Sequence, residues 1–368
     1  MVHSKKISVM HLGCPYLPYL GGSTTRLMNI VQSQDCDYLA LSLITPTEGV
    51  SPGDDKGFEC VLRTPSINKL MPSLKIFRFI KTVSPSIVVC HNSRVLLTWF
   101  LFYQVFFPKV RVIYELHSFR AENGYKELIN KFLYKLTDTI VTLSLASKRY
   151  MELHYSVSNV EVIRNGLELK NEGDKRVRTY TPGNVTYAYV GSYHNWQGVN
   201  VISKAVSKLG REFWSKNSLY MIGSGPEFLK VESEIKSLGF ENVHIYGWLG
   251  KSEINEILKT VDFLLAPRPS SLATETVLPL KVVDSINNCI PLIATNVGGL
   301  TEALMVGGEA AAVFIEKEVP VSSLVGAMKA GTSKEDYQLL LERMDQAALG
   351  LDTWKDISDK YSNLYERV

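Results

Sequence analysis

Cysteine is scarce in this sequence, and its spacing suggests neither disulfide bonds nor a metal site. The chain has five cysteines among 368 residues, at Cys14, Cys36, Cys60, Cys90 and Cys289. An odd number without a close pair fits neither a disulfide framework nor a zinc site built from paired cysteines. The sequence therefore favours a reducing compartment, the cytoplasm.

Long apolar runs and an excess of one charge are lacking as well. The longest apolar run without a charged residue, 95–107, has 13 residues, whereas a helix needs about 20 to span a bilayer. The charged N-terminus is not followed by the long apolar segment of a secretory signal. With 40 basic and 37 acidic side chains the formal charge is +3, so we expect no nucleic-acid partner.

What the sequence does contain is an alternation of short apolar runs with stretches of helical periodicity. This alternation predicts βαβ units on parallel sheets, and therefore an α/β fold. The predicted strands are 7–12, 38–43, 87–90, 110–114, 139–143 and 160–163 in the first half, and 185–190, 219–222, 243–246, 263–266 and 291–294 in the second.

A charged stretch at 169–184 interrupts this alternation and predicts a linker between two domains. We expect an N-terminal domain at 1–168 and a C-terminal domain at 185–345, each doubly wound and Rossmann-like, facing each other across a cleft. The tail from Ser333 onward reads as wholly helical. We expect its last part, 346–368, to pack back on the first domain.

The loop after the first predicted strand carries Gly21 and Gly22, followed by Ser23, Thr24 and Thr25. Two glycines allow a ligand to approach the backbone, and the N-terminus of the helix that follows favours an anion. No lysine follows at the spacing of a phosphate-binding P-loop. A tight turn with a hydroxyl cap explains the same residues equally well.

A second glycine-containing loop, 222–227, follows the strand at 219–222. It resembles a dinucleotide fingerprint, but Phe228 occupies the place of the third glycine and no acidic residue ends the next strand to hold a ribose. Hydride-transfer chemistry is therefore not indicated.

A third loop leads into a helix that begins after Pro279 and carries Lys281 and Asp284. Residues three apart project from one face of a helix. A cation there can neutralise phosphate oxygens, and a carboxylate can accept both hydroxyls of a ribose. A surface ion pair between the two side chains is the alternative.

Two further sets of side chains could carry chemistry. Asp35 and Asp37 imitate the paired aspartates of metal-dependent sugar transferases, but they precede a strand rather than follow one, so solvated charge is the better interpretation. His91 and His117 both end strands on the side where open α/β sheets bind ligands. No metalloprotease helix and no serine-elbow motif is present.

The order of these pieces resembles the retaining glycosyltransferases of family 4, which have the GT-B fold. The matching segments, in chain order, are Gly21-Gly22, Glu115-Leu116-His117, 138–141, Val162 to Gly166, Tyr189 to Gly191, Trp196 to Val199, Ile222 to Pro226, Ile245 to Gly247, Leu280 to Asp284, 291–295 and Gly298-Gly299. The resemblance covers most of the chain.

The resemblance implies a set of site residues. His117 would lie near the transferred sugar and Lys281 near the diphosphate, and together with Glu275 they would be the catalytic set. Asp284 would bind the ribose hydroxyls. The other donor-binding positions would be Gly21, Gly22, Ser192, Gln197, Gly223, Gly225, Tyr246, Gly247, Arg268, Thr276, Val277 and Leu278.

The chain departs from the family pattern at charged positions. Ser192 and Gln197 stand where relatives usually carry Arg and Lys on the phosphates. Relatives carry two carboxylates that are eight residues apart. The position of the first is occupied by Thr276 in this chain, and Glu275 stands one residue before it. Lys281, Arg268 and helix-terminal amides would then have to balance the phosphate charge.

The resemblance implies a retaining hexosyltransferase-like enzyme that uses a UDP- or GDP-linked sugar as substrate, needs no cofactor and no metal, and acts on a glycan or lipid-linked acceptor in bacterial surface polysaccharide synthesis. The leaving diphosphate itself would take the acceptor's proton. A sugar-nucleotide epimerase and a catalytically inactive homologue that acts as a binding subunit are the alternatives.

Contact with a membrane surface is a further hypothesis. In 74–81 the cations Lys75, Arg78 and Lys81 recur at helical spacing among apolar residues, and the apolar run 95–107 follows. Basic amphipathic helices can lie in the plane of the lipid interface, and they can equally pack on the sheet. This hypothesis puts the protein in the cytoplasm, peripheral on the inner face of the membrane.

Overall fold

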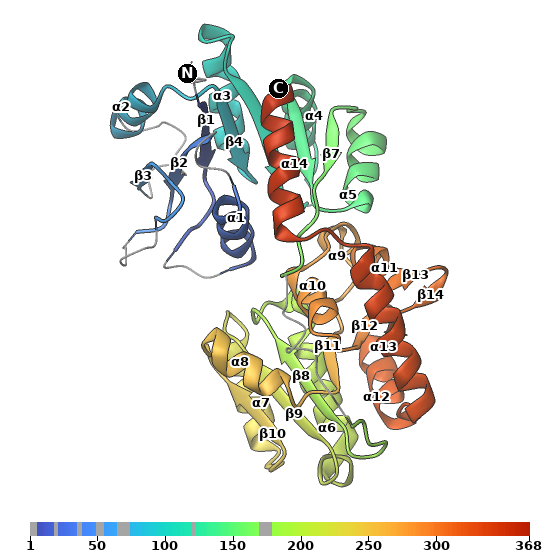
Figure 1. The fold of residues 1–368 in the computed structure, drawn as a ribbon. Helices are drawn as coiled ribbons and strands as arrows, with labels where there is room; N and C mark the ends of the chain where they lie inside the picture. Colours follow the sequence, from blue (N-terminus) through green and yellow to red (C-terminus); the bar gives the residue numbers. More distant parts are fainter. Residues whose placement is uncertain are drawn as a thin grey trace. The chain divides into compact units, whose positions relative to one another are not determined.

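The computed structural model describes residues 6–17, 21–34, 39–48, 55–64, 74–119, 122–168 and 179–368. The chain forms two compact units (Figure 1): residues Met1–Gly166 with Asp352–Val368, and residues Leu167–Leu351. The expected second domain, 185–345, is thus narrower at both ends than the unit that the structure forms.

The first unit is built on a seven-stranded parallel sheet in the order β3-β2-β1-β4-β5-β6-β7. The strands are β1 (Ile7–Leu12), β2 (Leu39–Thr45), β3 (Cys60–Arg63), β4 (Ile87–His91), β5 (Arg111–Leu116), β6 (Thr139–Thr142) and β7 (Val160–Val162). The helices are α1 (Gly22–Gln32), α2 (Leu74–Val83), α3 (Arg94–Phe106), α4 (Tyr125–Leu136), α5 (Leu145–Tyr150), the π-helical turn η2 (Met151–Tyr155) and α14 (Trp354–Arg367). The strand order reverses between β1 and β4.

The second unit repeats this plan with six parallel strands in the order β10-β9-β8-β11-β12-β15. The strands are β8 (Thr186–Val190), β9 (Ser218–Ile222), β10 (Val243–Tyr246), β11 (Phe263–Ala266), β12 (Leu292–Thr295) and β15 (Ala312–Ile315), and a hairpin adds β13 (Met305–Val306) and β14 (Glu309–Ala310). The helices are η4 (Asn195–Gln197), α6 (Val199–Trp214), α7 (Phe228–Ser237), α8 (Lys251–Leu258), α9 (Leu272–Thr276), α10 (Leu280–Asn287), α11 (Gly298–Leu304), α12 (Pro320–Ala330) and α13 (Lys334–Leu349). Here the order reverses between β8 and β11.

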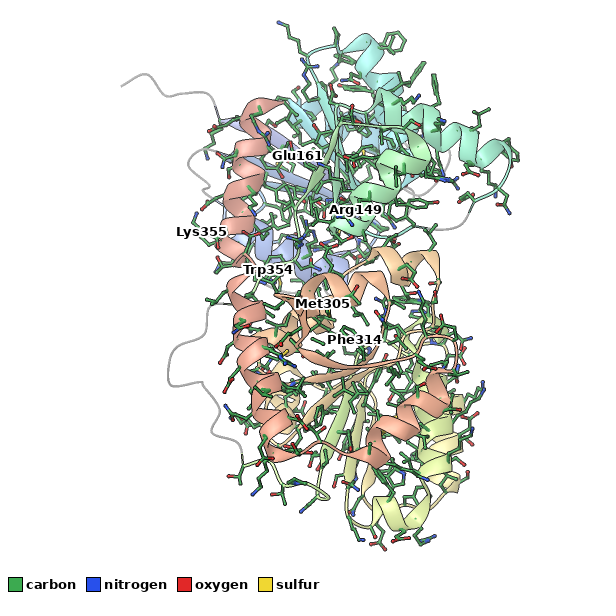
Figure 2. All side chains as sticks on the ribbon, turned by 90° about the vertical axis from the view of Figure 1, so that its right-hand side faces the viewer. Arg149, Glu161, Met305, Phe314, Trp354 and Lys355 are labelled. Carbon is green, nitrogen blue, oxygen red and sulfur yellow. The ribbon has the colours of Figure 1, made fainter. Side chains whose placement is uncertain are left out.

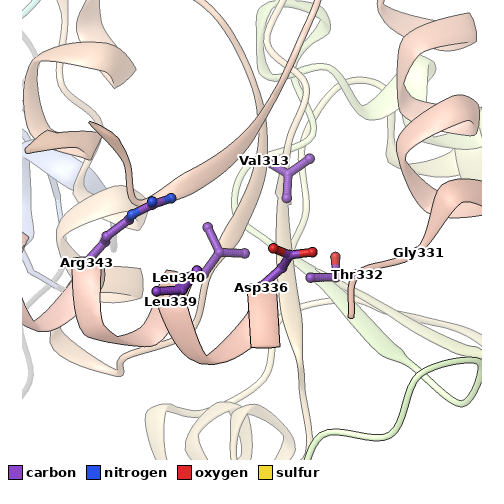
Figure 3. A pocket seen from close by; sticks show the side chains of 7 residues that line it. All are labelled: Val313, Gly331, Thr332, Asp336, Leu339, Leu340 and Arg343. Atoms are coloured by element: carbon purple, nitrogen blue, oxygen red, sulfur yellow. The ribbon is translucent and has the colours of Figure 1, made fainter. Parts of the chain in front are cut away.

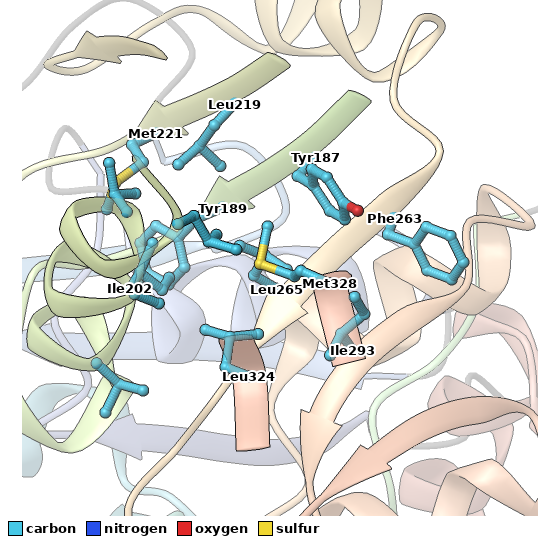
Figure 4. Close-up of a cluster of buried hydrophobic side chains, with 14 of the residues drawn as sticks. Tyr187, Tyr189, Ile202, Leu219, Met221, Phe263, Leu265, Ile293, Leu324 and Met328 are labelled. Atoms are coloured by element: carbon cyan, nitrogen blue, oxygen red, sulfur yellow. The ribbon is translucent and has the colours of Figure 1, made fainter. Parts of the chain in front are cut away.

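The core of the second unit shows why its sequence folds this way. Alternate strand residues such as Tyr187, Tyr189 and Leu265 meet one face of α6, and α12 adds Leu324 and Met328 (Figure 4). The predicted apolar face of α6, formed by Ile202, Ala205, Val206 and Leu209, is buried as expected. Burial of such side chains contributes roughly 1.5–3 kcal/mol each.

The tail forms two helices: α13 ends at Leu349 and α14 begins at Trp354. The side chain of Thr353 caps α14 by accepting from the Asp356 amide, and the Asp356 carboxylate accepts in return from the Thr353 amide. Helix α14 packs against α1 of the first unit. At the start of α14, Trp354 is buried, whereas Lys355 points into solvent (Figure 2).

Two remaining observations bear on surfaces. Within the described ranges, none of the helices combines the length and apolar content that a bilayer span requires. A hollow of about 280 Å³ lies between β15 and α13 of the second unit, lined by residues that include Val313, Asp336 and Arg343 (Figure 3). It contains none of the predicted site residues.

Candidate functional site

The second unit gathers most of the predicted donor-binding residues at one edge of its sheet. The loops that follow β8, β9, β11 and β12 all leave the carboxyl ends of parallel strands, and β8 and β11 flank the point where the strand order reverses. Open α/β sheets bind their ligands in the crevice at this point. The geometry of these loops therefore decides which of the predicted residues can meet a ligand.

Lys281 lies in the first turn of α10 with a buried ammonium group. Its Nζ has no hydrogen-bond partner among the described residues and sits 4.3 Å from the centre of the Tyr189 ring. Burial, with a smaller contribution from Arg268, lowers the pKa of Lys281 to about 7. A buried ammonium without a counter-charge is costly, so Lys281 is a site prepared for an anion. The alternative interpretation, a surface ion pair between Lys281 and Asp284, does not fit this buried ammonium, for which the described residues provide no partner.

Arg268 is the second buried cation at this edge. Its side chain is 1 % exposed, Nη1 donates to the Val277 carbonyl at 3.3 Å, and Nε has no partner in the described part of the chain. The guanidinium lies 5.5 Å from the centre of the Trp196 ring. Burial lowers the pKa of Arg268 to about 10, with a smaller opposing contribution from Tyr189. Two buried cations therefore share one edge, and the described part of the chain does not supply them with matching acceptors.

The glycines of the β8 and β9 loops are required by packing between the loops. A Cβ at Gly223 would lie 1.9 Å from the Gly191 carbonyl oxygen, and one at Gly225 would lie 2.8 Å from the Tyr193 backbone. Gly191 itself (φ 150°) leaves room for Lys281, whose Nζ would be 3.0 Å from an added Cβ. These glycines bring two loops together beneath the Lys281 ammonium.

The short helix α9 holds the predicted carboxylate. The Glu275 side chain accepts from Lys317 Nζ at 2.7 Å and Ser270 Oγ at 2.6 Å on one oxygen, and from the Gly298 amide at 2.8 Å on the other. Burial raises the pKa of Glu275, but the hydrogen bonds from Lys317, Ser270 and Gly298 outweigh it and lower the pKa. Glu275 is therefore ionised, and three of its roughly four acceptor positions are already used.

The neighbours of Glu275 have mostly structural contacts. The Thr276 hydroxyl donates to the Leu272 carbonyl at 2.6 Å, so this hydroxyl is used inside the helix. Val277 is half-buried and offers its carbonyl to Arg268, and Leu278 is buried in the core.

The remaining predicted donor residues differ in access. Ser192 is half-buried and its carbonyl accepts from Tyr189 Oη at 2.7 Å, while Gln197 is buried and its Oε1 has no hydrogen-bond partner among the residues that the structure describes. Tyr246, 37 % exposed, ends β10, and the Tyr246 and Gly247 carbonyls accept from the Gly223 amide. Asp284 is exposed on α10, one turn after Lys281.

The first unit contains a buried polar cluster that includes His117. Nε2 of His117 lies 2.9 Å from Glu115 Oε1 and 3.3 Å from Nδ1 of His91. Nε2 of His91 lies 3.0 Å from Nδ1 of His11. Except for His117, which is partly exposed, these side chains are buried. The histidine predicted to lie near the sugar thus forms the exposed end of a chain of rings.

Ligand atoms of His91, Glu115 and His117 lie within 4.8 Å of one another, close enough to hold a metal ion. Glu115 is, however, already bonded to the Arg26 guanidinium at 2.7 Å. Burial raises the pKa of Glu115, but Arg26 and the two histidines outweigh it and hold the pKa well below its usual range. The carboxylate charge is therefore matched by Arg26, and hydrogen bonds account for the cluster.

The predicted glycine loop of the first unit, with Gly21 and Gly22, lies in sequence between His11 and Arg26 of this cluster. Gly21 is the N-cap of α1 without a side-chain cap, and Gly22 is the first helical residue. Asp35 and Asp37 lie outside the described residues.

Several residues of these sites carry no sequence signal. Arg26, His11 and Tyr361 join Glu115 and His117 only in three dimensions, since Tyr361 is 246 positions from Glu115. Lys317 reaches Glu275 from beyond β15. A pattern search along one chain cannot find such pairs, because no fixed spacing links them.

Comparison with known proteins agrees with this architecture. The family described as "Glycosyl transferases group 1" matches residues 184–330, and "Glycosyltransferase Family 4" matches residues 20–171. An uncharacterised glycosyltransferase of Methanocaldococcus jannaschii is 22 % identical over 182 residues, which are 45 % of this chain and 46 % of that protein. The chain thus matches about half the length of this relative.

Solved structures match over the whole chain. A glycosyltransferase from Rickettsia africae is 15 % identical with a TM-score of 0.72, covering 99 % of both chains. Anabaena HepE, solved in complex with UDP and glucose, is 14 % identical with a TM-score of 0.73, covering 98 % of this chain and 100 % of HepE. At this identity the likeness establishes the shared two-domain fold.

Proposed function

Because this chain is a family 4 member of the group 1 glycosyltransferases and has the GT-B fold, we propose that it transfers a sugar from a UDP- or GDP-linked donor to a glycan or glycolipid acceptor. The observation that carries the proposal is the pair of buried, under-partnered cations Lys281 and Arg268. The diphosphate of a nucleotide-sugar supplies the acceptors that these cations lack.

The donor is proposed to bind the second unit with its diphosphate over Gly191 and beside the first turn of α10. The helix N-terminus after Pro279 adds free amides and a favourable dipole. Asp284 would accept the ribose hydroxyls, and the base would lie toward Tyr246 and Gly247. Lys281 and Arg268 replace the charges that Ser192 and Gln197 cannot provide.

The proposed reaction retains the configuration at the sugar. The bond between the sugar's C1 and the phosphate oxygen breaks, the acceptor oxygen bonds to C1 on the same face, and the acceptor's proton passes to the leaving phosphate. The protein positions both substrates and stabilises the charge that develops on the diphosphate. No step in this scheme requires a metal ion.

The proposed sugar transfer can be tested directly by measuring the release of nucleotide from sugar donors. We expect UDP or GDP to appear from one sugar donor of a panel and to appear faster with an acceptor. A donor at 100 times its dissociation constant should stabilise the protein by about 2.7 kcal/mol. Lys281→Met should lower turnover and affinity, whereas Lys208→Met, exposed on α6, is the matched control. Tight nucleotide binding without turnover by any donor would favour an inactive binding subunit.

We further propose that the acceptor is lipid-linked and that the first unit contacts an anionic membrane. Helices α3 and α4 contact each other and expose the large apolar residues Phe102, Val105, Phe106, Leu128, Ile129, Phe132 and Leu136. Lys126 and Lys135 are exposed on the same α4. Exposed apolar residues beside cations fit the interface of an anionic bilayer.

The segment 74–81, whose sequence also suggests membrane contact, forms most of α2, and its residues are divided between a buried and an exposed face. Ile76 and Ile80 are buried against the unit, while Phe77 and the cations Lys75, Arg78 and Lys81 are exposed. Because the larger exposed apolar surface lies on α3 and α4, co-sedimentation with vesicles of anionic lipid should fall when the α4 lysines Lys126, Lys131 and Lys135 are changed to Gln. The matched control changes Lys204, Lys208 and Lys216 of the second unit. Absence of binding at low salt would refute the membrane contact.

A further inference from the structure

The buried cluster of the first unit contains more groups than a single sugar contact needs. Three residues donate hydrogen bonds to the Glu115 carboxylate: Arg26 Nε at 2.7 Å and His117 Nε2 at 2.9 Å to Oε1, and Tyr361 Oη at 2.5 Å to Oε2. Glu115 and Arg26 are each 1 % exposed and Tyr361 is fully buried. The arrangement joins β5, α1 and the tail helix α14 at one carboxylate.

The direction of these hydrogen bonds follows from the chemistry of Glu115. An ionised carboxylate only accepts, so His117 must carry its hydrogen on Nε2. The same N–H also points toward Nδ1 of His91, 3.3 Å away, and that atom must then be an acceptor. His91 therefore carries its hydrogen on Nε2 and donates to Nδ1 of His11 at 3.0 Å.

The reverse order of protons conflicts with the carboxylate. If His11 donated to His91 and His91 to His117, an unprotonated Nε2 of His117 would face Glu115 Oε1 with two acceptors 2.9 Å apart. Burial lowers the pKa of His11 to about 4 and that of His91 well below its usual range, so both rings are neutral and each carries one hydrogen. Only one arrangement of hydrogens on the three histidine rings therefore satisfies these contacts.

This series of hydrogen bonds between the three histidine rings leaves Nδ1 of His117 unprotonated and thus able to accept a hydrogen bond. Its Nδ1 makes no hydrogen bond within the described residues, and the side chain is 14 % exposed. Arg26 already balances the charge of Glu115, so a second proton on His117 would leave the cluster with an unmatched positive charge.

We propose that Glu115 and Tyr361 are positioning residues that hold His117 in its Nε2–H tautomer, so that Nδ1 accepts a hydrogen bond from a hydroxyl of the sugar substrate. This inference rests on the proposed glycosyl transfer. Fixing a tautomer through the ring nitrogen that faces away from the substrate is a general device for orienting imidazole. The tail helix thereby contributes to the site through Tyr361 rather than by touching substrate.

The tautomer can be measured without substrate by long-range proton–nitrogen correlation on protein labelled with ¹⁵N-histidine. The chain has seven histidines, and His117→Gln identifies the signal of His117. We expect Nε2 protonated and Nδ1 unprotonated at neutral pH. An Nδ1–H tautomer or a doubly protonated ring in the parent protein would overturn the proposal.

The positioning role is tested by a pair of matched substitutions on α14. Tyr361→Phe removes only the hydroxyl that holds Glu115, whereas Tyr365→Phe removes another buried hydroxyl of the same helix, which interacts with Gln34 rather than holding the Glu115 carboxylate. We expect Tyr361→Phe to lower kcat about tenfold with little change in KM for the donor, equivalent to about 1.4 kcal/mol in the barrier. Tyr365→Phe should keep the parent's kcat.

Equal kcat values for the two variants would overturn the role of Tyr361. A fall in kcat that simply tracks a fall in thermal midpoint in both variants would do the same, because it would show a structural effect. If the parent transfers no sugar from any donor, the proposed function fails, and the histidine spectrum still decides whether the tautomer is assigned correctly.

Discussion

Raising the pH should weaken nucleotide binding because Lys281 must be charged to hold a diphosphate. Burial lowers the pKa of its ammonium to about 7 in the free protein. A bound diphosphate stabilises the charged form, so the pKa rises on binding and the complex takes up a proton. By linkage, affinity is fully present below the free pKa and is lost as pH increases above it.

The size of the effect follows from the fraction of Lys281 that is charged. With a pKa of about 7, this fraction falls from about one half at pH 7 to about one in a hundred at pH 9, so the dissociation constant of UDP or GDP should rise about 50-fold between these values. The terminal phosphate loses its last proton near pH 6 and thus contributes little over this range. Arg268, whose pKa is lowered to about 10, also stays largely charged.

Isothermal titration calorimetry supplies the assay and two internal controls. Repeating the titration in buffers of different ionisation enthalpy at pH 8 should reveal uptake of close to one proton per nucleotide bound. Lys281→Met should bind weakly at pH 7 and lose most of the dependence on pH. An affinity that is constant from pH 7 to pH 9 in the parent protein would refute the reasoning.

Three further predictions concern single substitutions in the second unit. Asp284→Ala should weaken donor binding about 100-fold or more, because two hydrogen bonds to a charged group contribute roughly 1.5–3 kcal/mol each; calorimetry with an unchanged dissociation constant would place the ribose elsewhere. Gly223→Ala should destabilise the unit by at least about 2 kcal/mol in chemical denaturation, since its Cβ would lie 1.9 Å from the Gly191 carbonyl oxygen; a parent-like midpoint would contradict this contact. Trp196→Ala should lower donor affinity about 3- to 10-fold by removing the ring over the Arg268 guanidinium, and equal affinities in a nucleotide titration would show that the ring has no such role.

The sequence predicted most of the parallel strands because each of these is a short apolar run, and several, such as β4, β6 and β12, are buried along their whole length. Strands β1, β10 and β11 were predicted with the bounds that the structure has. Strands β3 and β15 and the small hairpin β13–β14 were missed. Their segments are short or only partly buried, so period and composition do not separate them from loops.

In the candidate site, too, features that depend on a local sequence pattern were predictable, and contacts between distant residues were not. Lys281 was predictable because a proline, a helix start and a cation occur within three residues, and that pattern is local. Its lack of a partner was not predictable, since the neighbouring Asp284 offered an obvious one. The partners of Glu115 were hidden for a different reason: Arg26 and Tyr361 are 89 and 246 positions away, and only the closed fold brings them together.

The two buried arginines show how a structural cation differs from one that awaits a ligand. Arg26 donates to Glu115, to the carbonyls of Ile163 and Arg164, to Asn165 and to Tyr361. Burial alone would lower the pKa of Arg26, but Tyr361 and Glu115 reverse this and raise it.

Arg268 is equally buried, yet among the described residues it donates only to a carbonyl 3.3 Å away, and burial lowers its pKa. Leaving a buried charge unmatched costs stability, and Lys281 repeats that cost beside it. The second unit thus tolerates two such groups at the reversal point of its sheet, whereas the first unit satisfies a comparable arginine completely; this contrast supports the proposal that an anion arrives with the substrate.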